Sequence, residues 1–160
     1  MIKVEKDLVL KRLFPKETIK IEATTDKAGI AKSKEVFKSW LDPDFDSLDL
    51  DVEQKPSEGV EVEVYELKKG RTFKEIFASF KQDLDSLCFT QQQIVKFCQM
   101  YEDRLHPNWV TFFPFKENND YFIAYVRKYP DGLYALALCY EFNLVWEAKC
   151  SYRLVVPKTP

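Results

Sequence analysis

An acidic run between residues 42 and 53 has the residue types and spacing of a calcium site. Its carboxylates occupy positions 1, 3, 5 and 12 of a twelve-residue frame, as in a calcium loop of the EF-hand type. They belong to Asp42, Asp44, Asp46 and Glu53. Ser47 stands where such a loop needs glycine, and Pro56 interrupts the segment that should form the exit helix. We therefore interpret the run as a hydrated acidic loop, with a calcium site as the alternative, and predict no cofactor.

The lone histidine and the cysteines are the other candidates for chemistry. His106, with carboxylates or a thiol placed by the fold, would suit a small enzyme; the simpler interpretation is a histidine at a helix end. The four cysteines form no C-x-x-C pair, which excludes zinc-ribbon and thioredoxin spacing. They are Cys88, Cys98, Cys139 and Cys150. No G-x-S-x-G motif is present, and the presence of only four glycines disfavours phosphate-cradling loops, so no catalytic residue is predicted.

A helix-turn-helix is the third possibility, formed by two predicted helices around Cys88–Thr90. Glutamines 91–93 would open the second helix, and glutamine can pair with adenine in the major groove. That helix offers only Lys96 and Arg104 for phosphates, against two acidic neighbours. Nucleic acid is therefore a disfavoured partner, and an ordinary helical hairpin is the preferred interpretation.

Composition and charge limit the remaining classes of fold and function. The chain has 160 residues, 46% of them hydrophobic and 15% aromatic, with a net charge of −2. This predicts one domain over residues 1–160, with two sub-halves at 1–68 and 72–157. The charge is +4 over residues 1–41, −9 over 42–66 and +3 over 67–160. No apolar run suits a signal peptide or a membrane span, and free thiols fit a reducing compartment, so we expect a cytoplasmic protein without membrane contact.

The first sub-half is predicted to be rich in β-structure. Alternating apolar residues over 8–23 indicate a β-hairpin. Val36, Phe37, Trp40 and Leu41 have helical spacing, which predicts a short helix before Pro43. The alternation of valines over residues 60–64 indicates a strand with one buried face.

Two helices carry capping boxes. Thr72 with Glu75, and Thr90 with Gln93, have the spacing in which a hydroxyl and a side-chain carbonyl cap each other's amides. Apolar residues recur at helical spacing from Phe73 to residue 87 and, in the second helix, as far as residue 105. Each helix is therefore predicted to have one apolar face. The proline after His106 ends the second helix.

Four strands are predicted at 109–115, 121–128, 133–141 and 145–156. We expect a turn at 129–132 with a three-residue loop that sets Tyr125 opposite Ala137. Leu136 and Leu138 then face the helices, while Ala135 and Ala137 face outward. The predicted fold class is α+β: a mainly antiparallel sheet, with this C-terminal four-stranded meander packed on the helical hairpin, and a β-rich N-terminal half.

The outer face of this meander is the predicted working surface. Tyrosines, small residues and charges mix there, and tyrosine suits contact surfaces because it offers area at low entropy cost. The proposed partner-binding residues are Tyr121, Tyr125, Arg127, Glu141, Glu147, Lys149 and Arg153. We predict non-enzymatic binding of a protein or peptide, with self-association through a sheet edge also open. Packing of the N-terminal half on this face is the alternative.

Several motifs resemble a set of uncharacterised small proteins of candidate-phyla bacteria. They are Thr90–Ile94, Thr111–Lys116 with Trp109, Val145–Ala148 and Arg153–Pro157. The resemblance covers mainly residues 72–157. It implies a bacterial origin and a shared layout, and it carries no activity and no catalytic residue.

Overall fold

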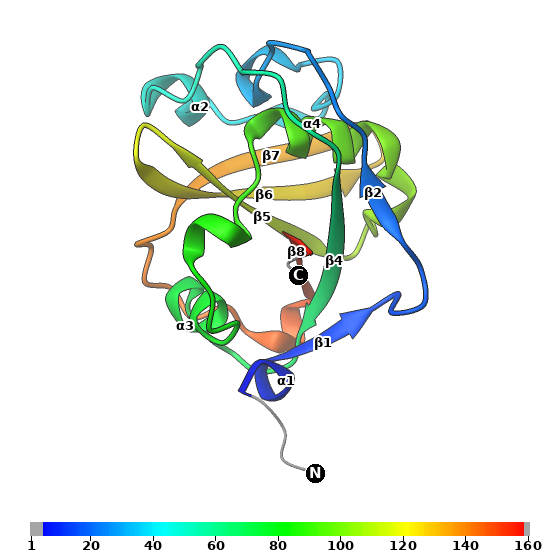
Figure 1. Ribbon diagram of the computed structural model, residues 1–160, viewed down its shortest axis with the longest axis vertical. Helices are drawn as coiled ribbons and strands as arrows, with labels where there is room; N and C mark the ends of the chain where they lie inside the picture. The colour runs from blue at the N-terminus through cyan, green and yellow to red at the C-terminus, as the bar shows by residue number, and fades with distance from the viewer. Residues whose placement is uncertain (1–4, 159–160) are drawn as a thin grey trace.

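The computed structural model describes residues 5–158. Within that range the chain is mostly β, with one mixed sheet and four short α-helices. The sheet order is β1-β4-β8-β5-β6-β7-β3, and β2 also pairs with β4. The strands are β1 Leu10–Leu13, β2 Ile19–Ile21, β3 Trp40–Leu41, β4 Val60–Leu67, β5 Val110–Glu117, β6 Asp120–Tyr129, β7 Gly132–Cys139 and β8 Tyr152–Pro157. The helices are α1 Glu5–Val9, α2 Asp44–Ser47, α3 Phe73–Ala78 and α4 Gln91–Met100. In Figure 1, β4 crosses the direction of β5, β6 and β7, so the sheet is strongly bent.

The predicted four-stranded antiparallel meander on a helical hairpin is wrong. Only β5, β6 and β7 follow one another as antiparallel neighbours. After β7 the chain forms no tight hairpin: it buries Trp146 under the sheet, makes a 3-10 turn at Ala148–Cys150, and enters β8 through Ser151 at φ 64°. β8 then pairs in parallel with β5 and antiparallel with β4. The edge of β7 that the fourth strand was predicted to occupy is taken by β3.

The register of β6 and β7 also differs from the prediction by one residue. Tyr129 pairs with Gly132, so the loop has two residues rather than three, and Tyr125 lies opposite Leu136. A one-residue shift turns every side chain of a strand to the other face. Ala135 and Ala137 are consequently buried, whereas Leu136 and Leu138 share the face of Tyr125 and are half-buried.

Both predicted capping boxes are confirmed, but the helical hairpin is not. Thr72 caps α3 and Thr90 caps α4, each with the reciprocal side-chain bond. α3 ends at Ala78, well before residue 87, and Lys81 follows with φ 54°, which no helix accommodates. Leu84–Leu87 forms a separate 3-10 turn. Figure 1 shows α3 and α4 on opposite sides of the β5–β6–β7 strands, so they cannot form one packed pair.

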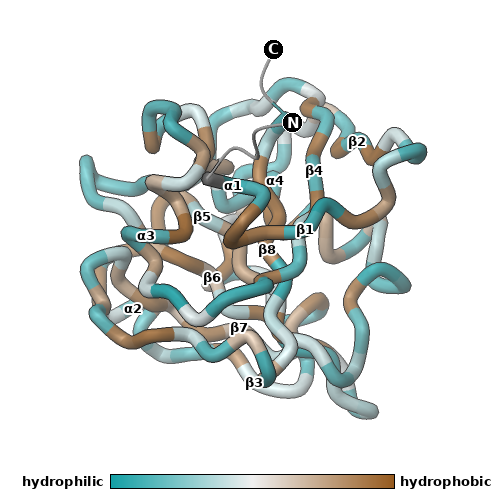
Figure 2. Tube along the Cα trace, turned by 90° about the horizontal axis from the view of Figure 1, so that it is seen from below, coloured by the Kyte–Doolittle hydropathy of each residue, from teal (hydrophilic) through white to brown (hydrophobic). Residues whose placement is uncertain are grey.

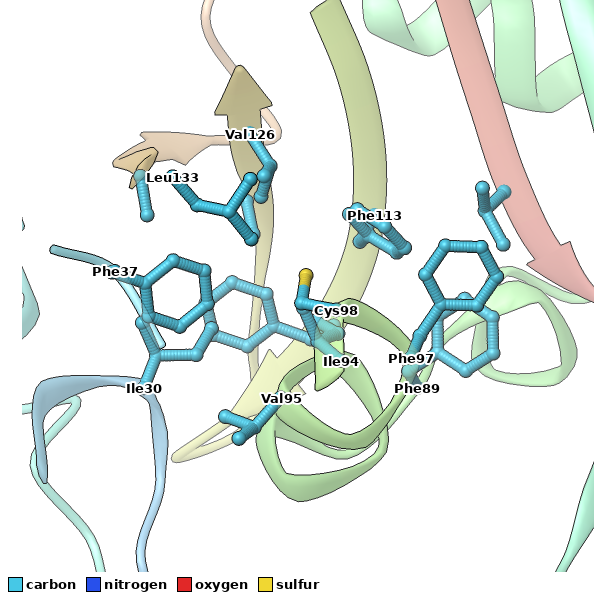
Figure 3. Close-up of a cluster of buried hydrophobic side chains, with 14 of the residues drawn as sticks. Ile30, Phe37, Phe89, Ile94, Val95, Phe97, Cys98, Phe113, Val126 and Leu133 are labelled. Carbon is cyan, nitrogen blue, oxygen red and sulfur yellow. The ribbon is translucent and has the colours of Figure 1, made fainter. Parts of the chain in front are cut away.

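Two apolar cores lie on the two faces of the sheet. The first core joins α4 and the segment of residues 30–50 to Phe113, Val126 and Ala135. In Figure 3 the α4 side chains Ile94 and Cys98 point toward the strands, and Ile30 and Phe37 close the core from the side. The second core packs α3 and the 142–150 segment on Phe112, Ile123 and Leu154. Figure 2 shows hydrophobic colour along the inner strands and hydrophilic colour over the outer connections.

The N-terminal strands form part of the same sheet. The predicted strand at residues 60–64 is confirmed as part of β4, with Val62 and Val64 buried. The predicted hairpin over residues 8–23 is wrong, because β1 and β2 both pair with β4 and not with each other. The predicted helix at residues 36–41 is also wrong: Trp40 and Leu41 form β3, which pairs in parallel with β7.

Candidate functional site

The second face of the sheet is only partly covered. α3 and the 142–150 segment pack on the strands near Phe112 and Ile123, but they leave the β6–β7 end open. Along β7, Leu133, Ala135 and Ala137 are buried in the first core, whereas Tyr134, Leu136 and Leu138 on the second face remain half-buried. The residues of this open end are therefore available for contact.

Four aromatic rings gather at that end, and we call Trp40, Tyr125, Tyr129 and Tyr134 the aromatic surface. Tyr134 lies in the middle. Its ring centroid is 5.0 Å from that of Trp40, in a stacked arrangement, and 5.6 Å from that of Tyr129, edge to face. Tyr125 contacts the same ring at 6.3 Å. Trp40 is 41% exposed and Tyr129 36%, which is unusual for side chains of this size.

The aromatic surface borders a shallow hollow of about 640 Å³. The hollow is lined by Ser39, Trp40, Tyr129, Pro130, Asp131 and Tyr134. The lining therefore comes from β3 and from both sides of the β6–β7 turn. These segments are distant in sequence, and only the pairing of β3 with β7 brings them together.

Backbone contacts hold Trp40 in this position. β3 sets Trp40 opposite Tyr134, and the N–H of Ser39 donates to the carbonyl of Leu133 at 3.0 Å. Gly132 permits the close approach of this segment: a Cβ at Gly132 would lie 2.8 Å from the Cβ of Lys38, and its φ of +138° disfavours any side chain.

Asp42, two residues after Trp40, also holds this segment against β7. Its carboxylate accepts from the N–H of Asp44 at 2.9 Å and from the N–H of Ala137 at 3.0 Å, while its own N–H donates to Ala135. The side chain is buried, so it joins the start of α2 to the outer edge of β7. A carboxylate accepting backbone N–H groups in this way is a strong structural contact.

The chemistry of the surface is that of stacking and hydrogen-bond donation. Burial raises the pKa of Tyr125 and of Tyr134 above the ordinary tyrosine value, so both phenols stay protonated donors near neutral pH. Arg127 lies among these rings, with its guanidinium carbon 5.1 Å from the centroid of Tyr129. Rings and a cation so arranged can bind planar or cyclic groups and an anion.

The structure brings only some of the predicted binding residues together. Tyr125 and Arg127 belong to the open end of the face. Tyr121 lies further along β6, where its hydroxyl donates to Asp85. Glu141 forms an ion pair with Lys74.

Glu147 and Lys149 are exposed on the 142–150 segment. Arg153 pairs with Thr111 and lies on the opposite face, between the rings of Phe14 and Trp109. The sequence argument missed Trp40, Tyr129 and Tyr134. A two-residue turn at Pro130–Asp131 would have placed Tyr134 opposite Arg127, on the same face as Tyr125, and is the signal that could have found it.

The acidic run forms no calcium loop. Its start is the helix α2, the two Asp42 oxygens are occupied by N–H groups, and Glu53 pairs with Lys27. Across residues 5–158, no three His, Cys, Asp or Glu side chains gather closely enough to hold a metal ion.

The other candidate sites also lack the geometry they require. His106 is exposed, and its Nδ1 accepts from the N–H of Asn108 rather than meeting an acid or a thiol. Gln91 and Gln92 are buried, so they cannot reach into a groove of DNA. Gln91 instead accepts from the N–H of Ile30 and donates to the carbonyl of Leu50.

Burial raises the pKa of the Cys88 thiol to about 12, which opposes a nucleophilic role. All four cysteines are free; Cys139 and Cys150 are exposed, and Cys98 is buried.

Comparison with known proteins adds no assignment. No family model, no curated protein and no solved structure matches the chain. Among the described residues, no helix has both the length and the apolar character needed to cross a bilayer.

Proposed function

We propose that this protein is a non-enzymatic binding module that holds a peptide segment of a partner protein on the aromatic surface. One observation carries the proposal: Trp40 and Tyr129 are exposed, yet their rings are held in contact with Tyr134. Large exposed aromatic groups cost solubility when they serve no purpose, and they are enriched where proteins contact one another.

Preorganisation supports the same conclusion. Trp40 is fixed by strand pairing, and Tyr134 packs against both neighbouring rings, so binding would order few new side chains. Rings that are already ordered lose little entropy on contact, and this favours affinity. The hollow is shallow and lacks a cluster of acid–base groups, which suits recognition better than catalysis.

The cellular setting belongs to the same proposal. Two of the four free thiols are exposed, and such thiols persist in a reducing compartment, so we infer a cytoplasmic location. The motifs that resemble candidate-phyla proteins favour a bacterial host. Self-association is a second way to cover the aromatic surface, and sedimentation distinguishes it from peptide binding.

A peptide-display selection tests the proposal. A random dodecapeptide library is selected on the wild-type protein, and the recovered peptides are measured against Trp40→Ala, Tyr129→Ala and Phe142→Ala. Phe142 is the matched control, because it is 46% exposed but lies outside the lining of the hollow.

We expect most recovered peptides to lose binding to the first two variants and to keep binding to the control. Recovery of no peptides, or of peptides that bind all three variants equally, would overturn the proposal. Sedimentation of the wild type and Trp40→Ala distinguishes self-association, which would appear as a dimer that the variant abolishes.

A further inference from the structure

Arg127 is the charged group of the aromatic surface, and its charge is not neutralised. Its Nε is buried and has no hydrogen-bond partner. Among residues 5–158, no carboxylate lies within ion-pair distance of its guanidinium. Arg12 and Arg104, by contrast, pair with Glu63 and Glu17. The Tyr129 ring stabilises this cation in part, and a ligand carboxylate, which suits the planar donor groups of arginine, would supply the missing negative charge.

The rings next to Arg127 favour an extended chain. Trp40, Tyr134 and Arg127 are paired across β3, β7 and β6, so they form a row across the sheet. The Tyr134 ring is 5.0 Å from that of Trp40, and the Tyr129 ring lies beside the row, 5.6 Å from that of Tyr134 and 5.1 Å from the Arg127 guanidinium carbon. Adjacent strands lie about 4.8 Å apart, so the row is about 10 Å long, and a polyproline II chain, which rises about 3.1 Å per residue, spans it with roughly three residues. Proline-containing segments dock on rows of exposed aromatic rings because they are already extended and lose little entropy.

Charge complementarity then specifies the occupant. Asp131, in the β6–β7 turn, is the one carboxylate in the lining of the hollow. Near Arg127 the neighbouring groups are the phenols of Tyr125 and Tyr129, and burial raises the pKa of Tyr125 above its ordinary value. The Arg127 end of the row therefore attracts a negative group.

We propose that the ligand is an extended, proline-containing peptide segment that carries a carboxylate to Arg127, with its prolines on Trp40, Tyr134 and Tyr129. This inference depends on the proposed peptide-binding function. It adds the chemical class of the partner and assigns Arg127 as the residue that selects it.

Three labelled nine-residue peptides with capped ends test the inference by fluorescence anisotropy. The first has a central glutamate between two runs of four prolines, the second has glutamine in its place, and the third keeps the glutamate between glycine–serine runs. We expect the first peptide to bind most tightly and the glutamine peptide to bind roughly tenfold more weakly. Added salt should narrow that difference, since it screens the ion pair. Arg127→Gln should bind the first two peptides equally.

The possible results distinguish failure of the proposed ligand class from failure of the proposed peptide-binding function. Equal binding of the glutamate and glutamine peptides to wild type overturns the role of Arg127, even where both depend on Trp40. Equal binding of the glycine–serine peptide overturns the preference for proline. If none of the three binds while the display selection yields Trp40-dependent peptides, the ligand class is wrong and the binding function stands. Trp40-dependent binding of oligothymidylate would replace the peptide with a single-stranded nucleic acid.

Discussion

Replacement of Asp42 by alanine should destabilise the protein strongly, although the residue lies in an acidic segment that resembles a hydrated loop. The carboxylate accepts two backbone N–H groups, and the one from Ala137 is buried. A hydrogen bond to a charged group contributes about 1.5–3 kcal/mol, and the N–H of Asp44 can recover part of its loss by binding water. We expect Asp42→Ala to lower the free energy of unfolding by about 3 kcal/mol. For a chain of this length that corresponds to a fall in Tm of roughly 6–12 °C.

Asp42→Asn should lose about half as much, because its amide retains one acceptor oxygen. Thermal unfolding followed by circular dichroism measures both variants, with Asp46→Ala as the matched control, since Asp46 is exposed on α2, the short helix that follows Asp42. The control should change Tm by no more than about 1 °C. If Asp42→Ala is as stable as Asp46→Ala, the carboxylate does not fasten α2 to β7. A calcium-dependent rise in the wild-type Tm that Asp42→Ala abolishes would restore the metal site and refute this account.

Three further outcomes follow from other contacts. Gly132→Ala should weaken peptide binding and cost about 1–3 kcal/mol, because the new methyl group would displace the segment before Trp40; unchanged binding would show that this approach is unimportant. Gln91→Leu should cost about 2–4 kcal/mol by urea unfolding, since it leaves buried polar groups unpaired, while the exposed Gln99→Leu should be nearly neutral. A thiol reagent should modify the exposed Cys139 and Cys150 quickly, the half-buried Cys88 more slowly, and the buried Cys98 only after unfolding; four equal rates would contradict this burial.

Local chemistry was predictable from the sequence. The capping boxes at Thr72 and Thr90 were recognised because a cap involves only four consecutive residues. β4 was recognised because alternation within one strand reports its buried face. Information of this kind is complete within a short segment and does not depend on distant parts of the chain.

Long-range pairing was not predictable in the same way. The one-residue difference at the Pro130–Asp131 turn reversed the faces of β7, so the predicted partner face combined Tyr125 with the wrong neighbours. Trp40 was assigned to a helix because its apolar neighbours have helical spacing. Its actual conformation depends on Gly132 and Leu133, more than 90 residues away in sequence. Two residues of the candidate site, Tyr125 and Arg127, were thus predictable from the sequence. The stacked rings of Trp40 and Tyr134 were not, because only the tertiary structure brings them together.

The indole N–H signals of the three tryptophans test the central claim most directly. A protein labelled with ¹⁵N at tryptophan is titrated with the most enriched peptide from the display selection, and Trp40→Phe assigns the Trp40 signal. The account predicts that this signal shifts progressively while those of Trp109 and Trp146 stay in place. A shift confined to Trp109, on the other face of the sheet, or no shift of Trp40 at saturating peptide, would contradict it.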